Sequence, residues 1–229
     1  RRTGYRADHD LTKPEVQRRE LLAAAVTSTT ANAVGWIAAP CTSYCDWSLQ
    51  NGGTRTFATP EGGASGQPLT KNEVVGNALS DFAAHWFERR LEARKLPFAE
   101  SSAPSGRYSK QWDLPSWQRV LARTDVEYRD FLLMCGFGLG PPGATESGQY
   151  YKRATRLVAR RIPGLLDGIA RPCPGQGPRR QHVALKGNRP GSSVSRCTVG
   201  QGAWWTAGAK QLIRRSTTLP QSPTMTTKP

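Results

Sequence analysis

Apolar residues recur at helical spacing in the middle of the chain. Between residues 72 and 94 they fall every three or four positions, and three arginines follow toward the end of that segment. This spacing predicts an amphipathic helix, with cations at its carboxyl-terminal end, where the helix dipole is negative. Residues 11–25 predict a second helix with Thr12 as its N-cap, and residues 115–121 predict a third.

Short continuous apolar runs alternate with these helices. Three of them cover residues 34–39, 96–99 and 131–137, and a fourth covers residues 156–159. Runs of this length are typical of strands that are buried on both faces. Strands that alternate with helices predict an α/β fold with a mostly parallel sheet and helices on both of its faces. Residues 42–67, rich in Gly, Ser and Thr, predict a long loop.

Positive charge is concentrated in the last third of the chain. Residues 1–149 carry 17 Lys and Arg against 16 Asp and Glu, whereas residues 150–229 carry 15 against the single acid Asp167, within a net charge of +15. The excess of positive charge creates an electrostatic field that attracts phosphate polymers, so nucleic acid is the expected partner. A solvated basic tail, or a genome that overuses arginine, would give the same composition.

Composition also divides the chain. We expect an α/β core over residues 1–172, a basic Pro/Gly-rich extension over residues 173–215 and a disordered tail over residues 216–229. No apolar run approaches the roughly 20 residues that span a bilayer, so no membrane association is expected. The basic residues are interleaved with Pro and Gly, which also disfavours an amphipathic membrane-surface helix.

Five cysteines are an odd number for a disulfide-stapled protein, and no signal peptide opens the sequence. Reduced thiols, and hence an intracellular location, nuclear in a eukaryote, are expected. A zinc site could be imagined from the cysteines and one histidine, but their spacings match no common zinc motif, so no metal is expected. These candidates are Cys41, Cys45, Cys173, His182 and Cys197.

Two residues at predicted strand ends could carry chemistry. Cys41 directly follows the run 34–39, so its thiol would be presented at the edge of the sheet, as a nucleophile requires. Glu100 follows the run 96–99, where a carboxylate needs a hydrogen-bonding partner. The alternatives are a buried cysteine that acts as a small apolar residue and an exposed acid at the end of a strand.

The order of these features resembles the DNA cytosine-5 methyltransferase family, in its phage and retroelement-associated branch with sequences familiar from dinoflagellates. The resemblance covers roughly residues 8–200. It is carried by a Pro-Cys motif after an apolar strand, a helix with an acid and an amide, a second strand that ends in a glutamate, and the segments that follow. These residues are Ala39-Pro40-Cys41, Glu73, Asn77, Glu100, Ser105, Trp112, Cys135-Gly136-Phe137-Gly138 and Tyr151-Lys152-Arg153-Ala154-Thr155-Arg156.

The resemblance implies a covalent mechanism on a flipped cytosine. Cys41 would be the thiolate that adds to carbon 6 of the ring, and Glu100 would supply a proton or hydrogen bond at ring nitrogen 3. Arg153 matches a basic motif that holds the base carbonyl, and either Thr155 or Arg156 falls on the next position of that motif.

Cofactor and DNA contacts are implied in the same way. S-adenosylmethionine would be the methyl donor, with Asp10 and Pro40 beside it, although helix capping is an equal alternative for Asp10. The expected nucleic-acid contacts are Lys152, Arg156, Arg179, Arg180, Lys186 and Arg189.

The sequence also departs from the family. No FxGxG-type loop precedes Asp10, Ser101 stands where the family has Asn, and Ala39 stands where Pro is common. We therefore expect a Rossmann-like α/β fold with an incomplete N-terminal edge and an irregular basic C-terminal region. Two functions stay open: a methyltransferase-like domain, active or inactivated by truncation, and a non-catalytic basic nucleic-acid-binding remnant of a mobile-element polyprotein.

Overall fold

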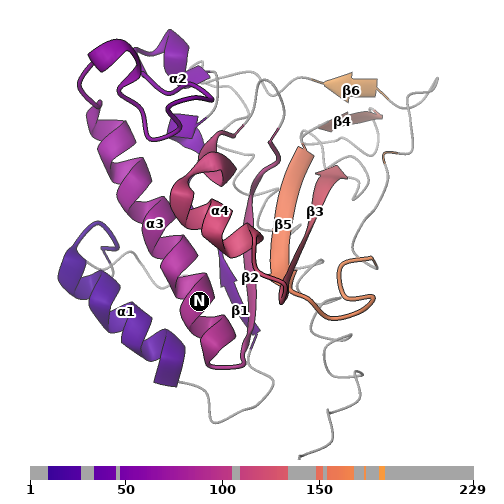
Figure 1. The fold of residues 1–229 in the computed structure, drawn as a ribbon. Helices are drawn as coiled ribbons and strands as arrows, with labels where there is room; N and C mark the ends of the chain where they lie inside the picture. Colours follow the sequence, from indigo (N-terminus) through magenta and orange to yellow (C-terminus); the bar gives the residue numbers. More distant parts are fainter. Residues whose placement is uncertain are drawn as a thin grey trace, which may run out of the picture.

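The computed structural model of the chain contains one larger sheet, one small sheet and a set of helices (Figure 1). The structure describes residues 10–26, 34–44, 47–104, 109–133, 148–151, 154–167, 173 and 181–183. Its helices are α1 (Pro14–Val26), α2 (Trp47–Gln50), α3 (Lys71–Glu92) and α4 (Pro115–Leu121), with 3-10 turns η2 (Thr42–Tyr44), η3 (Ala64–Gly66) and η4 (Gln111–Asp113). Its strands are β1 (Val34–Ile37), β2 (Leu96–Ser102), β3 (Val126–Leu133), β4 (Gln149–Tyr151), β5 (Ala154–Arg160) and β6 (Gln181–Val183).

The larger sheet has the strand order β1-β2-β5-β3. β1 and β2 are parallel, whereas β5 is antiparallel to both of its neighbours, β2 and β3. β1, β2 and β3 therefore run in one direction and β5 runs against them. The prediction of a mostly parallel sheet is wrong for this sheet, because an apolar run indicates that a strand is buried but not in which direction it runs.

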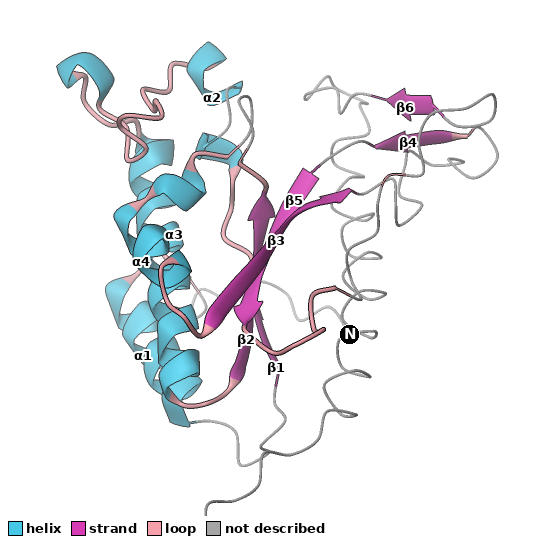
Figure 2. Ribbon diagram, turned by 45° about the vertical axis from the view of Figure 1, so that its right-hand side comes forward, coloured by secondary structure: helices cyan, strands magenta, loops and turns pink. Residues whose placement is uncertain are grey.

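Helices cover one face of this sheet. Figure 2 shows α1, α3 and α4 on the same side of the strands. α3 connects β1 to β2, and α4 connects β2 to β3, so both connections progress across the sheet in the same direction. Right-handed crossovers that progress in one direction put their helices on one face. The expectation of helices on both faces is therefore not met in the described part of the chain.

Each face of the sheet has its own apolar cluster. The helical face holds the larger cluster, in which the Trp112 and Trp117 rings meet edge to face with centroids 4.9 Å apart. The opposite face holds a smaller cluster of Phe98, Leu157, Ala159, Leu165 and Leu166. Alternate residues of β2 and β5 contribute to these two clusters, as the period of a strand requires.

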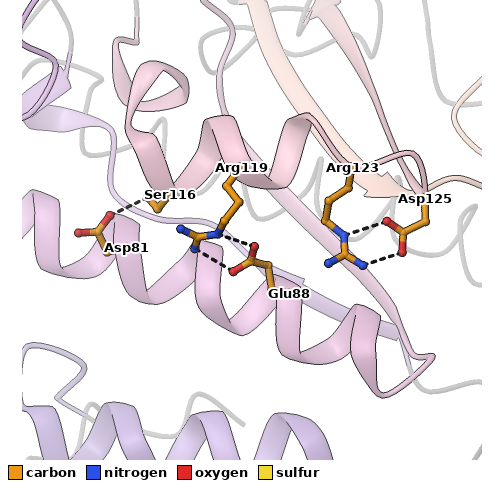
Figure 3. A network of polar contacts seen from close by, with 6 residues as sticks. All are labelled: Asp81, Glu88, Ser116, Arg119, Arg123 and Asp125. Carbon is orange, nitrogen blue, oxygen red and sulfur yellow. Dashed lines mark hydrogen bonds and ion pairs between the residues drawn. The ribbon is translucent and has the colours of Figure 1, made fainter.

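Polar contacts fix α4 on α3 (Figure 3). The Ser116 hydroxyl donates to the Asp81 carboxylate at 2.6 Å, and the Arg119 guanidinium donates two hydrogen bonds of 2.9 Å to the Glu88 carboxylate. A two-point contact of this kind sets direction as well as distance. It holds α4 against α3.

The predicted helices and strands differ from the observed ones mainly at their ends. The helices predicted over residues 72–94 and 115–121 are confirmed. The run 96–99 becomes the longer strand β2, so Glu100 lies inside a strand and not at its end. β3 starts at Val126 and ends at Leu133, and overlaps the predicted strand 131–137 by only three residues.

Candidate functional site

Cys41 lies four residues beyond Ile37, the carboxyl-terminal residue of β1. Its side chain is half-buried, and the Ser102 hydroxyl lies within hydrogen-bond reach of its sulfur, with Oγ and Sγ 3.4 Å apart. Ser102 is the last residue of β2, which pairs in parallel with β1. The parallel pairing thus brings Cys41, in the segment that follows β1, next to the last residue of β2.

Glu100 points to the same face of the sheet as Ser102, because it lies two positions earlier in the same strand. Its carboxylate side chain is largely buried, at 8% exposure. Across the antiparallel pairing, Ser102 faces Thr155 and Glu100 faces Leu157. Cys41, Glu100, Ser102 and Thr155 therefore gather on the face that lies away from the helices, at the carboxyl-terminal part of β2.

Arg156 lies on the other face of the sheet. Its guanidinium donates to the Asp130 carboxylate, with Nη2 at 2.7 Å, and lies 4.3 Å from the centre of the Tyr128 ring. It is only 8% exposed, so within the fold its charge is directed toward Asp130, and the expected phosphate contact stays a prediction. Of the two alternatives for the second position of the basic motif, Thr155 is the one on the Cys41 face, because consecutive residues of a strand point to opposite faces.

Both expected cofactor residues, Asp10 and Pro40, lie in the described part of the chain. The Asp10 carboxylate accepts hydrogen bonds from the Thr12 backbone N–H at 3.0 Å and from the Thr12 hydroxyl at 2.7 Å. Asp10 therefore closes a turn before α1, which begins at Pro14. Pro40 is exposed beside Cys41.

A buried arginine anchors the segment that follows Cys41, and the sequence pattern did not single it out. The Arg55 side chain is fully buried and donates to Asn77 Oδ1 at 2.7 Å, to the Glu73 carbonyl at 2.9 Å and to Ser43 Oγ at 3.3 Å, as well as to the Pro60 carbonyl. These acceptors belong to η2, to the loop and to α3. One guanidinium thus ties three segments together.

Tyr44 links this network to the nucleophile candidate. Its ring lies 3.9 Å from the Arg55 guanidinium, and its hydroxyl donates to Asn77 Oδ1 at 3.1 Å. Burial raises the pKa of Tyr44 to about 12, against the opposing influence of the Arg55 cation. The Tyr44 backbone N–H donates to the Cys41 carbonyl at 3.0 Å, so the network reaches the backbone of Cys41.

Glu73 closes the same loop onto the start of α3. Its carboxylate accepts from the backbone N–H groups of Thr54 at 2.6 Å and Thr70 at 2.8 Å. Burial alone raises the pKa of Glu73, but these hydrogen bonds outweigh burial and hold the pKa below its ordinary value. The sequence signal for this contact is the capping box Thr70-x-x-Glu73, whereas nothing local in the sequence marks Arg55.

Gly76 permits the close approach of η2 to α3. A Cβ atom at this position would lie 2.3 Å from Ser43 Oγ, which is far inside contact distance. The glycine is therefore required by the packing of the segment that holds Cys41.

The remaining expected residues lie outside the described residues. These are Arg153, Lys152, Arg179, Arg180, Lys186, Arg189, Cys45, Cys135 and Cys197. Cys173 and His182 are described, with Sγ 3.2 Å from Nε2. Within the described ranges no three His, Cys, Asp or Glu side chains are grouped so that they could hold a metal ion.

Within the same ranges, no helix combines the length and the apolar character that a bilayer crossing needs. Comparisons of the chain with protein-family models, with curated proteins and with solved structures gave no match. The geometry around Cys41 and Glu100 is therefore the basis for a functional proposal.

Proposed function

We propose that this chain is a DNA cytosine-5 methyltransferase-like domain in which Cys41 is the nucleophile and Glu100 the general acid. The observation that supports it most directly is the position of the Cys41 sulfur, 3.4 Å from the Ser102 hydroxyl. Ser102 lies on the same face as Glu100, about 7 Å further along one strand. Because the sulfur lies beside Ser102, and Glu100 is on the same face two residues earlier, we infer that one pyrimidine ring contacts both the thiol and the carboxyl group.

The chemistry requires both groups. The Cys41 thiolate adds to carbon 6 of cytosine, which forms the S–C6 bond and breaks the C5–C6 π bond. The displaced electron pair is delocalised toward ring nitrogen 3, which takes a proton from Glu100. The product is an enamine that is nucleophilic at carbon 5, the position that an unmodified cytosine cannot offer to an electrophile.

The strand arrangement supports a ligand at this place. β1, β2 and β3 run in one direction and are connected through α3 and α4, with the antiparallel β5 between β2 and β3. In open α/β sheets ligands bind beyond the carboxyl ends of the parallel strands. Cys41 follows the carboxyl end of β1, and Ser102 is the carboxyl-terminal residue of β2.

The target base must leave a duplex to reach a thiol at the edge of a sheet, at a cost of a few kcal/mol. Single-stranded substrate avoids this cost. The basic last third of the chain, with 15 Lys and Arg against one acid from residue 150 onward, supplies the attraction for the phosphate backbone.

The methyl donor is a separate matter. The family resemblance implies S-adenosylmethionine, but the described residues do not fit it: the Asp10 carboxylate is bound to Thr12 in the turn before α1. An acid that holds a cofactor hydroxyl or adenine would need to stand at a strand end, as in other doubly wound sheets. The reaction that we propose for this chain therefore extends only to formation of the enamine.

The test is hydrogen exchange at carbon 5, which needs no methyl donor. The full chain is incubated with a single-stranded oligonucleotide in deuterated buffer, and the deuterium content of its cytosines is measured by mass spectrometry. We expect exchange with the natural chain and none with Cys41→Ser. With Glu100→Gln the exchange rate should fall by about 100-fold or more. Ser101→Ala, on the opposite face, is the matched control. Exchange that persists in Cys41→Ser, or no exchange by a natural chain that binds the oligonucleotide, would overturn the proposal.

The charge distribution supports a second candidate, a basic nucleic-acid-binding module without base chemistry. Such a module retains DNA with an affinity that falls steeply as salt rises, because each neutralised phosphate releases counterions. Cys41→Ser would bind with the same salt slope as the natural chain, and neither would exchange the carbon 5 hydrogen.

A further inference from the structure

We infer that Ser102 is a positioning residue for Cys41, and that its hydroxyl donates a hydrogen bond to the sulfur in the thiolate state. The inference deepens the proposed function, because it concerns the same thiol. It is carried by the 3.4 Å contact between Ser102 Oγ and Cys41 Sγ and by the burial of Ser102, which is 5% exposed.

The backbone of Ser102 is fixed from two sides. The Trp112 indole N–H donates to the Ser102 carbonyl at 2.7 Å, and the next residue, Ala103, donates to the Ala154 carbonyl at 3.1 Å. Trp112 is itself buried against Trp117. The Cα–Cβ bond of Ser102 is therefore aimed by the core, and its hydroxyl is presented to the Cys41 face.

A hydrogen bond at this place favours the charged form of the thiol. An O–H donor interacts more strongly with a thiolate than with a neutral thiol, because the acceptor carries the charge. Glu100 lies on the same face and, when ionised, works against a second negative charge. The Ser102 hydroxyl offsets part of this repulsion and keeps the sulfur directed toward the Glu100 face.

The neighbouring serine provides a matched control. Ser101 is also buried, at 3% exposure, but it points to the helical face, where its hydroxyl donates to Gln111 Oε1 at 2.6 Å. Both positions hold the same residue type in the same strand. Removal of either hydroxyl tests burial and hydrogen bonding equally, and only one of the two touches the sulfur.

The experiment measures alkylation of Cys41 by iodoacetamide in the full chain, followed on the peptide that contains residue 41 by mass spectrometry across a range of pH. The sulfur forms a bond to carbon, and iodide leaves. We expect Ser102→Ala to slow alkylation near neutral pH by about 3- to 10-fold and to move the half-maximal rate to higher pH. Ser102→Thr, which retains a hydroxyl, should keep the natural profile.

Ser101→Ala should also keep the natural profile, even where it lowers thermal stability. If Ser102→Ala and Ser101→Ala change the pH profile equally, or if neither changes it, the inference is wrong. The readout is independent of base chemistry: a chain that shows this alkylation profile but no carbon 5 exchange would refute the proposed function and leave the role of Ser102 intact.

Discussion

Replacement of Arg55 by methionine should unfold the segment after Cys41 more readily than any surface change. The natural guanidinium is fully buried and donates to four acceptors in η2, the loop and α3. Methionine keeps most of the aliphatic length and can still pack on the Tyr44 ring, which lies 3.9 Å from the guanidinium. It supplies no donor, so the buried acceptors lose their partner.

The magnitude follows from the number of orphaned groups. One buried polar group without its partner costs about 1–3 kcal/mol, and removal of one side of a buried charged network costs about 3–5 kcal/mol. The acceptors share one donor and relax together, so the costs do not add. We expect the free energy of unfolding to fall by about 3–5 kcal/mol, and the melting temperature by roughly 10 °C, for a chain of this size.

Urea unfolding followed by tryptophan fluorescence measures this loss. Arg55→Lys should recover only part of it, because an ammonium group cannot reach the same four acceptors at once. Arg19→Met is the control, since Arg19 forms an exposed ion pair with Glu20 that contributes at most about 1 kcal/mol. An Arg55→Met variant within 1 kcal/mol of the natural chain would show that the network does not hold the loop.

Three further predictions concern the same region. Because the pKa of Glu73 lies below its ordinary value of 4.5, the ionised side chain stabilises the fold above pH 4.5, and this contribution is lost as the pH falls below that value. Glu73→Gln should flatten the dependence of the urea midpoint on pH between 3 and 6, and an unchanged dependence would contradict the assignment. Tyr44 should ionise near pH 12 and not near 10, so its contribution to the free energy of unfolding is complete below pH 10 and is lost as the pH rises toward 12. The late phase of an ultraviolet titration should be absent in Tyr44→Phe, and its persistence there would assign that phase to another tyrosine. Gly76→Ala should destabilise the chain by about 1–3 kcal/mol despite the better helix propensity of alanine, because its methyl group meets Ser43 Oγ; the melting temperature should recover in part when Ser43→Ala is added, and a stabilised single variant would refute the close contact.

Sequence patterns located the helices because helical spacing and end signals are local. α3 begins after the capping box at Thr70, and α4 begins with Pro115, both of which are visible in the sequence. Strand direction and strand order are not local properties. The position of β5 between β2 and β3 depends on pairings between residues that are far apart in the chain, such as Ser102 with Thr155, and no periodicity records them.

Local sequence marked the candidate residues of the site but not their contacts. Cys41 and Glu100 each follow an apolar run, and this local pattern is what marked them as candidates. The partners of these residues come from tertiary contacts: Ser102 reaches the sulfur only because β1 pairs with β2. Arg156 looked like a surface cation, but Asp130 on the neighbouring strand neutralises it within the fold.

The place of β5 has a consequence for the order of folding. β2 and β3 are synthesised before β5. They do not pair with each other, because β5 lies between them in the sheet. During synthesis both strands must wait, with an open edge, until residues 154–160 leave the ribosome. Unpaired edges recruit other chains, so a nascent or shortened product that stops before Ala154 should be the species most exposed to aggregation and most dependent on chaperones.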